Sequence, residues 1–146
     1  MPTEIRACAV IPVFDHGTTI GAVVDGLRDC GLPCIIVDDG SGSECARVLD
    51  GLARSVPEVS LVRLPANRGK GAAVAAGLSR ARAAGYTHAL QIDADGQHAV
   101  ADVPAFVAMA RADPEALICA RPIFDATIPK SRLYGRQLSR LWVKIN

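Results

Sequence analysis

Short apolar runs alternate along the chain with longer segments of helical periodicity, and most runs end in a polar or glycine-rich turn. Such runs predict strands that are buried on both faces of a parallel sheet, with helices as the crossovers. We expect five strands, at residues 6–11, 34–37, 59–64, 88–92 and 116–119. We expect four helices, from Thr18 or Thr19 to Cys30, after an N-cap at Ser43, and at residues 69–84 and 103–112, with Gly31 and Gly85 as terminating glycines.

Crossovers of this length are right-handed, so the pattern predicts a Rossmann-like α/β fold, a mostly parallel twisted sheet with helices on both faces. In such sheets ligands bind beyond the carboxyl ends of the strands. The turns that follow the strands are therefore where functional side chains are expected.

Composition supports one domain with one core, because the chain has 146 residues of which 50% are hydrophobic and 21% charged. The 16 basic and 15 acidic side chains nearly cancel, which argues against a nucleic-acid-binding protein. Residues 121–146 nevertheless hold six of the basic side chains and one acidic one. We therefore expect an α/β domain over residues 1–120 and a separate basic tail over residues 121–146.

Five cysteines without a CxxC pair are expected to be buried, reduced thiols. The chain opens without a signal-peptide pattern, and it has no run of 18 apolar residues. We expect a cytoplasmic protein, either soluble or peripheral on the inner face of a membrane.

Asp93 and Asp95 follow the fourth expected strand, two residues apart, and an extended chain points such side chains to the same side. With Gln97 they offer the oxygen ligands that Mg2+ or Mn2+ prefers. The alternative is an ordinary turn at Asp95-Gly96 with Asp93 as a cap.

Two further turns carry charge. Asp38 and Asp39 end the second strand before a glycine-containing turn, where a carboxylate can accept from a ribose hydroxyl or a base, or can simply cap a helix. Lys70 and Arg68 enter the third helix among glycines, as at a phosphate-facing helix N-terminus. A P-loop is excluded, because glycine follows Lys70. His16 and His98 lie in other such turns, where a histidine can bind a metal or transfer a proton but is more often polar surface.

Four segments together resemble the family 2 glycosyltransferases, and most closely the polyprenol-phosphate sugar transferases. They are residues 10–14 (Val-Ile-Pro-Val-Phe), 35–41 (Ile-Ile-Val-Asp-Asp-Gly-Ser), 67–73 (Asn-Arg-Gly-Lys-Gly-Ala-Ala) and 93–98 (Asp-Ala-Asp-Gly-Gln-His). The resemblance implies a GT-A fold and a metal-dependent transfer of a sugar from a nucleoside diphosphate donor, with inversion. It also implies a lipid-phosphate acceptor, which is already ionised and needs no general base.

The resemblance also implies the roles of individual residues. Asp93 and Asp95 are the expected catalytic pair and, with Gln97, hold Mg2+ or Mn2+ on the diphosphate. The expected nucleotide-binding residues are Pro12, Val13, Phe14, Asp15, Asp38, Asp39, Lys70 and Asp93. Arg121 and Arg132 are candidates for binding the acceptor phosphate. Asp15 stands where relatives usually carry Asn, and relatives extend beyond this length, so the chain looks like an N-terminal portion.

The basic tail repeats Arg132, Arg136, Arg140 and Lys144 opposite an apolar helical stripe. Such a helix could lie on an anionic membrane or pack against protein. Two rival functions are a non-catalytic nucleotide-binding fragment and a HAD-type phosphatase. The phosphatase is disfavoured, because its motif should follow the first strand and its glycine should precede Thr or Ser.

Overall fold

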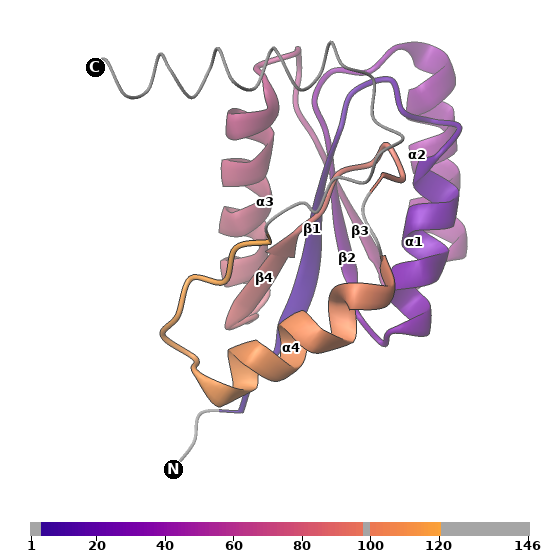
Figure 1. Cartoon of the computed structure of the whole chain (residues 1–146). Coiled ribbons are helices and arrows are strands. Elements are labelled where there is room, and N and C mark those ends of the chain that lie inside the picture. Colours follow the sequence, from indigo (N-terminus) through magenta and orange to yellow (C-terminus); the bar gives the residue numbers. More distant parts are fainter. Residues whose placement is uncertain (1–3, 98–99, 121–146) are drawn as a thin grey trace, which may run out of the picture.

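A computed structural model of the chain describes residues 4–97 and 100–120. Four strands form one parallel sheet in the order β3-β2-β1-β4, and helices connect them (Figure 1). The elements are β1 (Ala7–Val13), α1 (Ile20–Asp29), β2 (Cys34–Asp38), α2 (Ser43–Ser55), β3 (Val59–Arg63), α3 (Lys70–Ala83), β4 (His88–Gln91), the 3-10 turn η1 (Val100–Asp102) and α4 (Val103–Ala112). The parallel α/β layer expected from the apolar runs is confirmed.

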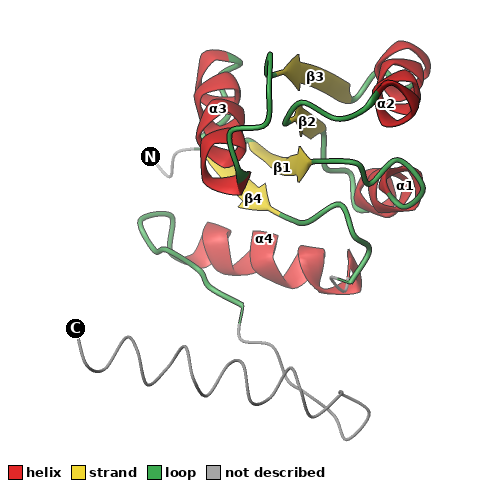
Figure 2. Ribbon diagram, turned by 90° about the horizontal axis from the view of Figure 1, so that it is seen from above, coloured by secondary structure: helices red, strands yellow, loops and turns green. Residues whose placement is uncertain are grey.

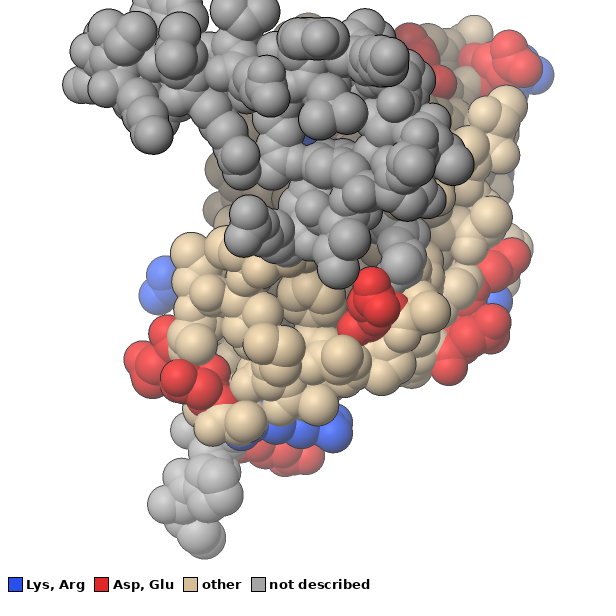
Figure 3. Space-filling model, viewed as in Figure 1, with Lys and Arg blue, Asp and Glu red and all other residues tan. Residues whose placement is uncertain are grey.

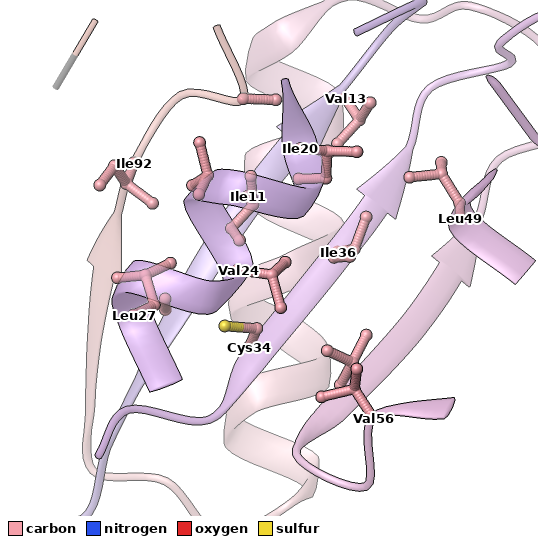
Figure 4. Packing of buried hydrophobic residues seen from close by; sticks show 14 of the residues in the cluster. Ile11, Val13, Ile20, Val24, Leu27, Cys34, Ile36, Leu49, Val56 and Ile92 are labelled. Carbon is pink, nitrogen blue, oxygen red and sulfur yellow. The ribbon is translucent and has the colours of Figure 1, made fainter. Parts of the chain in front are cut away.

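The alternation of side chains along the strands divides the core between the two faces of the sheet. Ile11 of β1 and Ile36 of β2 point to one face, where they pack with Leu27 of α1 and Leu49 of α2 (Figure 4). These side chains are fully buried. Burying one Leu or Ile contributes roughly 1.5–3 kcal/mol, so this cluster is a main source of stability.

The opposite face is covered by α3 (Figure 2), whose buried side chains there, Ala73 and Ala81, are small. Gly77 of α3 lies so close to the sheet that an added Cβ would be 2.3 Å from Val10 Cγ1 and 3.0 Å from Val37 Cγ2. The small residues of α3 therefore let the helix backbone approach β1 and β2, which places the first residue of α3 beside the ends of those strands.

Both predicted terminating glycines are confirmed. Gly31 and Gly85 have φ of 70° and 79° and directly follow the residues that cap α1 and α3. The amide of the next residue then bonds back to the last turn, from Leu32 to Leu27 and from Tyr86 to Ala81. Glycine is favoured in this left-handed conformation because it lacks a Cβ.

Three details of the sequence prediction are wrong. Residues 116–119 form no strand and Leu117 is 90% exposed, because an apolar run makes a strand only beside a partner, and none of the described residues pairs with this one. The N-cap of α2 is Gly42 rather than Ser43, which is the first helical residue. Of the five free cysteines, Cys8, Cys34 and Cys45 are buried as expected, but Cys119 is exposed.

Helix α4 lies beyond β4 at the edge of the sheet (Figure 2). Val103 is its buried residue, whereas Met109 is 54% exposed. Charged side chains on this face lie mostly toward its rim (Figure 3). The helix thus covers one edge of the core.

Candidate functional site

A cleft of about 300 Å³ lies at the carboxyl ends of β1 and β4. The chain reverses its strand order between these two neighbours, which is where open α/β sheets bind ligands. The cleft is lined by Pro12, Val13, Phe14, His16, Asp39, Asn67, Gly69, Lys70, Ala73, Asp93, Ala94 and Asp95. Four turns that are distant in sequence therefore contribute to one site, as the motif analysis predicts.

The end of β1 forms an apolar wall of the cleft. Val13 is buried in the core, whereas the next side chain, Phe14, is 47% exposed. Val13, the last residue of β1, thus anchors the strand, while Phe14 in the bend that follows can offer its ring to a ligand. A flat apolar surface of this kind suits a nucleobase or another planar group.

The two adjacent carboxylates after β2 have different partners. Asp39 lines the cleft, and its two oxygens accept hydrogen bonds from the amides of Arg68 and Gly69 at 2.8 and 2.9 Å. Asp38 is outside the lining, and its oxygens accept from the Ser41 amide at 2.9 Å and from Arg63 Nε at 2.8 Å. The structure thus brings Asp39, and not Asp38, to the cleft.

The environment of Asp38 keeps it ionised. Burial alone would raise the pKa of this carboxyl, but hydrogen bonds from Ser41 and the guanidinium of Arg63 outweigh burial and hold the pKa below its usual value. Arg63 also reaches Asp50 of α2 at 3.1 Å. Asp38 is therefore a charged anchor that ties the end of β2 to β3 and to the turn before α2.

Asp15 also organises this loop region rather than the cleft lining. Its amide donates to Ser41 Oγ at 3.1 Å, and its Oδ1 accepts from the Gly42 amide at 2.8 Å. Its backbone is left-handed, with φ of 55°, which Asp tolerates better than most residues. The turn after β1 is thereby held against the turn after β2.

Gly40 brings the turn after β2 against the loop that precedes α3. A Cβ at this position would lie 2.5 Å from the backbone nitrogen of Asn67, and the φ of Gly40 is 75°. Only glycine fits both the conformation and the contact. The close approach allows Asp39 to reach the amides at the start of α3.

Lys70 and Asp93 meet across the cleft. Lys70 Nζ lies 2.6 Å from Asp93 Oδ1 and 2.7 Å from Asp93 Oδ2. The side-chain amide of Gln91 donates from Nε2 to the same Oδ1 at 2.7 Å. The carboxylate of Asp93 is thus oriented by a cation from α3 and by a neutral donor from the end of β4.

Asp95 lines the cleft in the turn that follows Asp93. Its Oδ1 accepts from the Gln97 amide at 3.0 Å, and Gly96 takes the left-handed φ of 73° that the turn needs. Gln97 is exposed and lies outside the lining. The Thr19 hydroxyl donates to the carbonyl of Ala94, which holds this turn against the start of α1.

Two of these contributions were not anticipated from the sequence, and a third was ranked below a surface role. His16, the third, lines the cleft. Asn67 also lines the cleft, from the loop between β3 and α3. The contact of Thr19 with Ala94 joins positions that are 75 residues apart, so no local pattern could reveal it.

Arg121, Arg132, His98 and the basic tail lie outside the described residues. Within residues 4–97 and 100–120, none of the helices has both the length and the apolarity that crossing a bilayer requires.

The donor atoms of the cleft suit a divalent cation that is shared with a ligand. Asp93 and Asp95 offer carboxylate oxygens, and Mg2+ commonly uses one or two carboxylates while phosphates and water complete its shell. Among the described residues no three His, Cys, Asp or Glu side chains gather as a closed metal cage. Asp93 and Asp95 could therefore hold such an ion together with a diphosphate.

The chain is also similar to known proteins. Residues 8–144 match the model of the family described as Glycosyl transferase family 2. An uncharacterized protein of Methanocaldococcus jannaschii is 31% identical over 98 residues, or 66% of this chain and 43% of that protein. A dolichyl-phosphate beta-glucosyltransferase of Trichomonas vaginalis is 31% identical over 106 residues, or 65% of this chain and 31% of the relative.

A polyprenol monophosphomannose synthase of Mycolicibacterium smegmatis is 26% identical over 130 residues, or 87% of this chain and 49% of the relative. The chain thus spans about a third to a half of the curated relatives that it matches. Among solved structures, a mannosyltransferase of Pyrobaculum calidifontis in complex with GDP-Man and Mn2+ superimposes with a TM-score of 0.52. The identity is 22%, and the match covers 64% of this chain and 29% of that one, which supports the GT-A fold. By the family match over nearly its whole length, this chain belongs to glycosyl transferase family 2.

Proposed function

We propose that this chain is the donor-binding part of a glycosyltransferase that moves a sugar from a nucleoside diphosphate to an acceptor. The observation that carries the proposal is the cleft at the ends of β1 and β4, where Lys70, Asp93 and Asp95 converge. A site for a nucleoside diphosphate sugar needs a planar apolar surface, a group for the ribose and charges for the diphosphate. The cleft lining contains a candidate for each: Phe14 for the base, Asp39 for the ribose, and Lys70 with the two carboxylates for the diphosphate and its cation.

The nucleoside is assigned to the side formed by Pro12, Val13 and Phe14, with Asp39 as the acceptor for a ribose or base donor. Asp39 is already held by two amides, so it can accept a ligand hydrogen bond without moving. Asp38 and Asp15 are assigned to holding the loops that shape this side. The GDP-Man bound by the structurally similar mannosyltransferase supports the donor class.

The diphosphate is assigned to the side of Lys70, Asp93 and Asp95. When bound there by Asp93 and Asp95, with Gln97 nearby, Mg2+ or Mn2+ would neutralise the charge that develops on the departing nucleoside diphosphate. The ammonium of Lys70 donates to a phosphate oxygen and adds a second positive charge. The Mn2+ in the similar mannosyltransferase supports this choice of ion.

A lipid phosphate is the acceptor that we propose, because two relatives are named for dolichyl-phosphate and polyprenol monophosphomannose chemistry. A phosphate oxygen is ionised at neutral pH and can attack the sugar without a general base, with inversion at the anomeric carbon. This acceptor would place the protein on the cytoplasmic side of a membrane surface. Arg121, Arg132 and the basic tail remain candidates for contacting it.

Calorimetric titration of the 146-residue chain with GDP and with UDP, each with and without Mn2+, tests the proposal. We expect binding that depends on Mn2+, and we expect Asp95→Ala to abolish it while the circular dichroism spectrum stays unchanged. Asp29→Ala is the matched control, because it removes an exposed carboxylate at the end of α1. This variant should bind nucleotide and Mn2+ as the wild type does. Absent or metal-independent binding would refute the assigned site.

Turnover separates the proposed transferase from a non-catalytic nucleotide-binding fragment. Incubation with GDP-mannose or UDP-glucose, Mn2+ and a polyprenyl phosphate should yield a glycosylated lipid, detected by mass spectrometry. Metal-dependent binding without product would leave the donor site assigned and would reduce the chain to a binding fragment.

A further inference from the structure

The ion pair between Lys70 and Asp93 joins two groups that the proposed chemistry uses separately. Both oxygens of Asp93 lie within 2.7 Å of the Lys70 ammonium, so the pair is bidentate. Gln91 holds Oδ1 of the same carboxylate. In this structure a positive charge of the protein therefore occupies the face of Asp93 that a cation would approach.

A divalent cation and an ammonium compete for the same carboxylate oxygens. Binding a metal at Asp93 would require Lys70 to release at least one oxygen, or would place like charges a few ångströms apart. The pair is not locked in place, because the side chain of Lys70 is 58% exposed and that of Asp93 is 26% exposed. Exposed pairs of this kind break easily, and a lysine side chain has four rotatable bonds.

We infer that Lys70 serves as a resident counter-cation that holds Asp93 in the empty site, opposes metal binding there, and transfers to the diphosphate when donor and metal arrive. The inference rests on the proposed function, since it needs a diphosphate as the new partner of Lys70. The metal binds weakly to the empty protein and tightly in the presence of nucleotide.

The position of Lys70 supports such a transfer. It is the first residue of α3, where amide groups and the helix dipole favour an anion. Gly69 before it is left-handed, with φ of 88°, and its amide is held by Asp39. The base of the lysine is thus fixed to the nucleoside side of the cleft, while its ammonium reaches the metal side.

Mn2+ binding to the nucleotide-free chain, followed by electron paramagnetic resonance of free Mn2+, tests the inference without any turnover. Lys70→Met removes the charge and keeps the length of the side chain, so we expect it to bind Mn2+ about fivefold more tightly than the wild type. Lys70→Arg keeps the charge and should stay within about twofold of the wild type. Both variants leave the core residues of α3 unchanged, and circular dichroism checks their fold.

Arg68→Met is the matched control. It removes an equal charge two residues before Lys70, in the loop that leads into α3, but Arg68 is not among the residues that line the cleft. We expect less than half of the effect of Lys70→Met on Mn2+ affinity. An equal effect would mean that the general charge of the loop, rather than the contact with Asp93, sets the affinity, and would overturn the inference.

The second measurement repeats the Mn2+ titration with saturating GDP. Nucleotide should tighten Mn2+ binding in the wild type, and by linkage Mn2+ should tighten nucleotide binding by the same factor. In Lys70→Met this factor should fall severalfold without reaching one, because the metal still contacts the diphosphate directly.

The outcomes distinguish the two proposals. If the wild type shows no coupling between Mn2+ and either GDP or UDP, the proposed donor site fails. If the wild type shows coupling, but Lys70→Met leaves the Mn2+ affinity of the empty chain unchanged or weaker, only the role of Lys70 as a counter-cation fails.

Discussion

Replacing Gly77 with alanine would test how α3 positions the cleft. The new Cβ would lie 2.3 Å from Val10 Cγ1 and 3.0 Å from Val37 Cγ2, whereas ordinary carbon contacts are about 3.5–4.0 Å. Both valines are fully buried, and β-branched side chains have little rotamer freedom. Relief therefore requires α3 to move away from the sheet by about 1 Å.

Overpacking of this size costs about 1–3 kcal/mol, and the better helix propensity of alanine returns up to about 1 kcal/mol. Gly71→Ala, in the first turn of the same helix, makes the same chemical change where nothing lies within 4 Å. The propensity gain is common to both variants, so their difference isolates the clash at Gly77. We expect the free energy of unfolding of Gly77→Ala to be lower than that of Gly71→Ala by about 1–3 kcal/mol.

Urea unfolding followed by circular dichroism measures this difference, with thermal unfolding as a second probe. A loss of 1 kcal/mol should lower the melting temperature by about 2–4 °C in a chain of this size. Because Lys70 begins α3, a shift of this helix in Gly77→Ala should also weaken Mn2+-dependent GDP binding. Gly71→Ala should not shift the helix. Equal midpoints and slopes for the two variants would refute the close packing of α3 on Val10 and Val37.

Two further predictions concern ionisable groups in the core. The pKa of Asp38 is lower in the folded chain than its ordinary value of 3.8, so its stabilising effect is complete above that pH and is lost as the pH falls through the lower folded pKa. The stability difference between the wild type and Asp38→Asn, measured by urea unfolding from pH 6 to pH 2, should therefore shrink as the pH falls; a constant difference would contradict the ion pair with Arg63. Burial raises the pKa of Cys8 to about 11 and that of Cys34 to about 12, whereas Cys119 is exposed. Iodoacetamide at pH 8 should label Cys119 in the native chain and spare the other two, as checked by peptide mass spectrometry, and labelling at Cys34 before Cys119 would show that the core is open.

The local pattern of the chain was sufficient to predict most of its elements. The apolar run at residues 34–37 becomes part of a parallel strand because both faces of the sheet are covered there, and consecutive apolar residues indicate this burial. The end of α1 was also predictable, because Gly31 adopts a left-handed backbone that few other residues adopt. Residues 116–119 have the same apolar character but no partner strand among the described residues, and pairing is not a local property.

The sequence also indicated which turns belong to the site, because the carboxyl ends of parallel strands lie at one edge of a sheet. It could not divide the work between Asp38 and Asp39, which are adjacent and chemically identical. Tertiary structure decides this division, since Arg63 and Ser41 enclose one carboxylate while the amides before α3 hold the other toward the cleft. The same holds for Lys70 and Asp93, whose contact exists because small residues let α3 pack closely on the sheet.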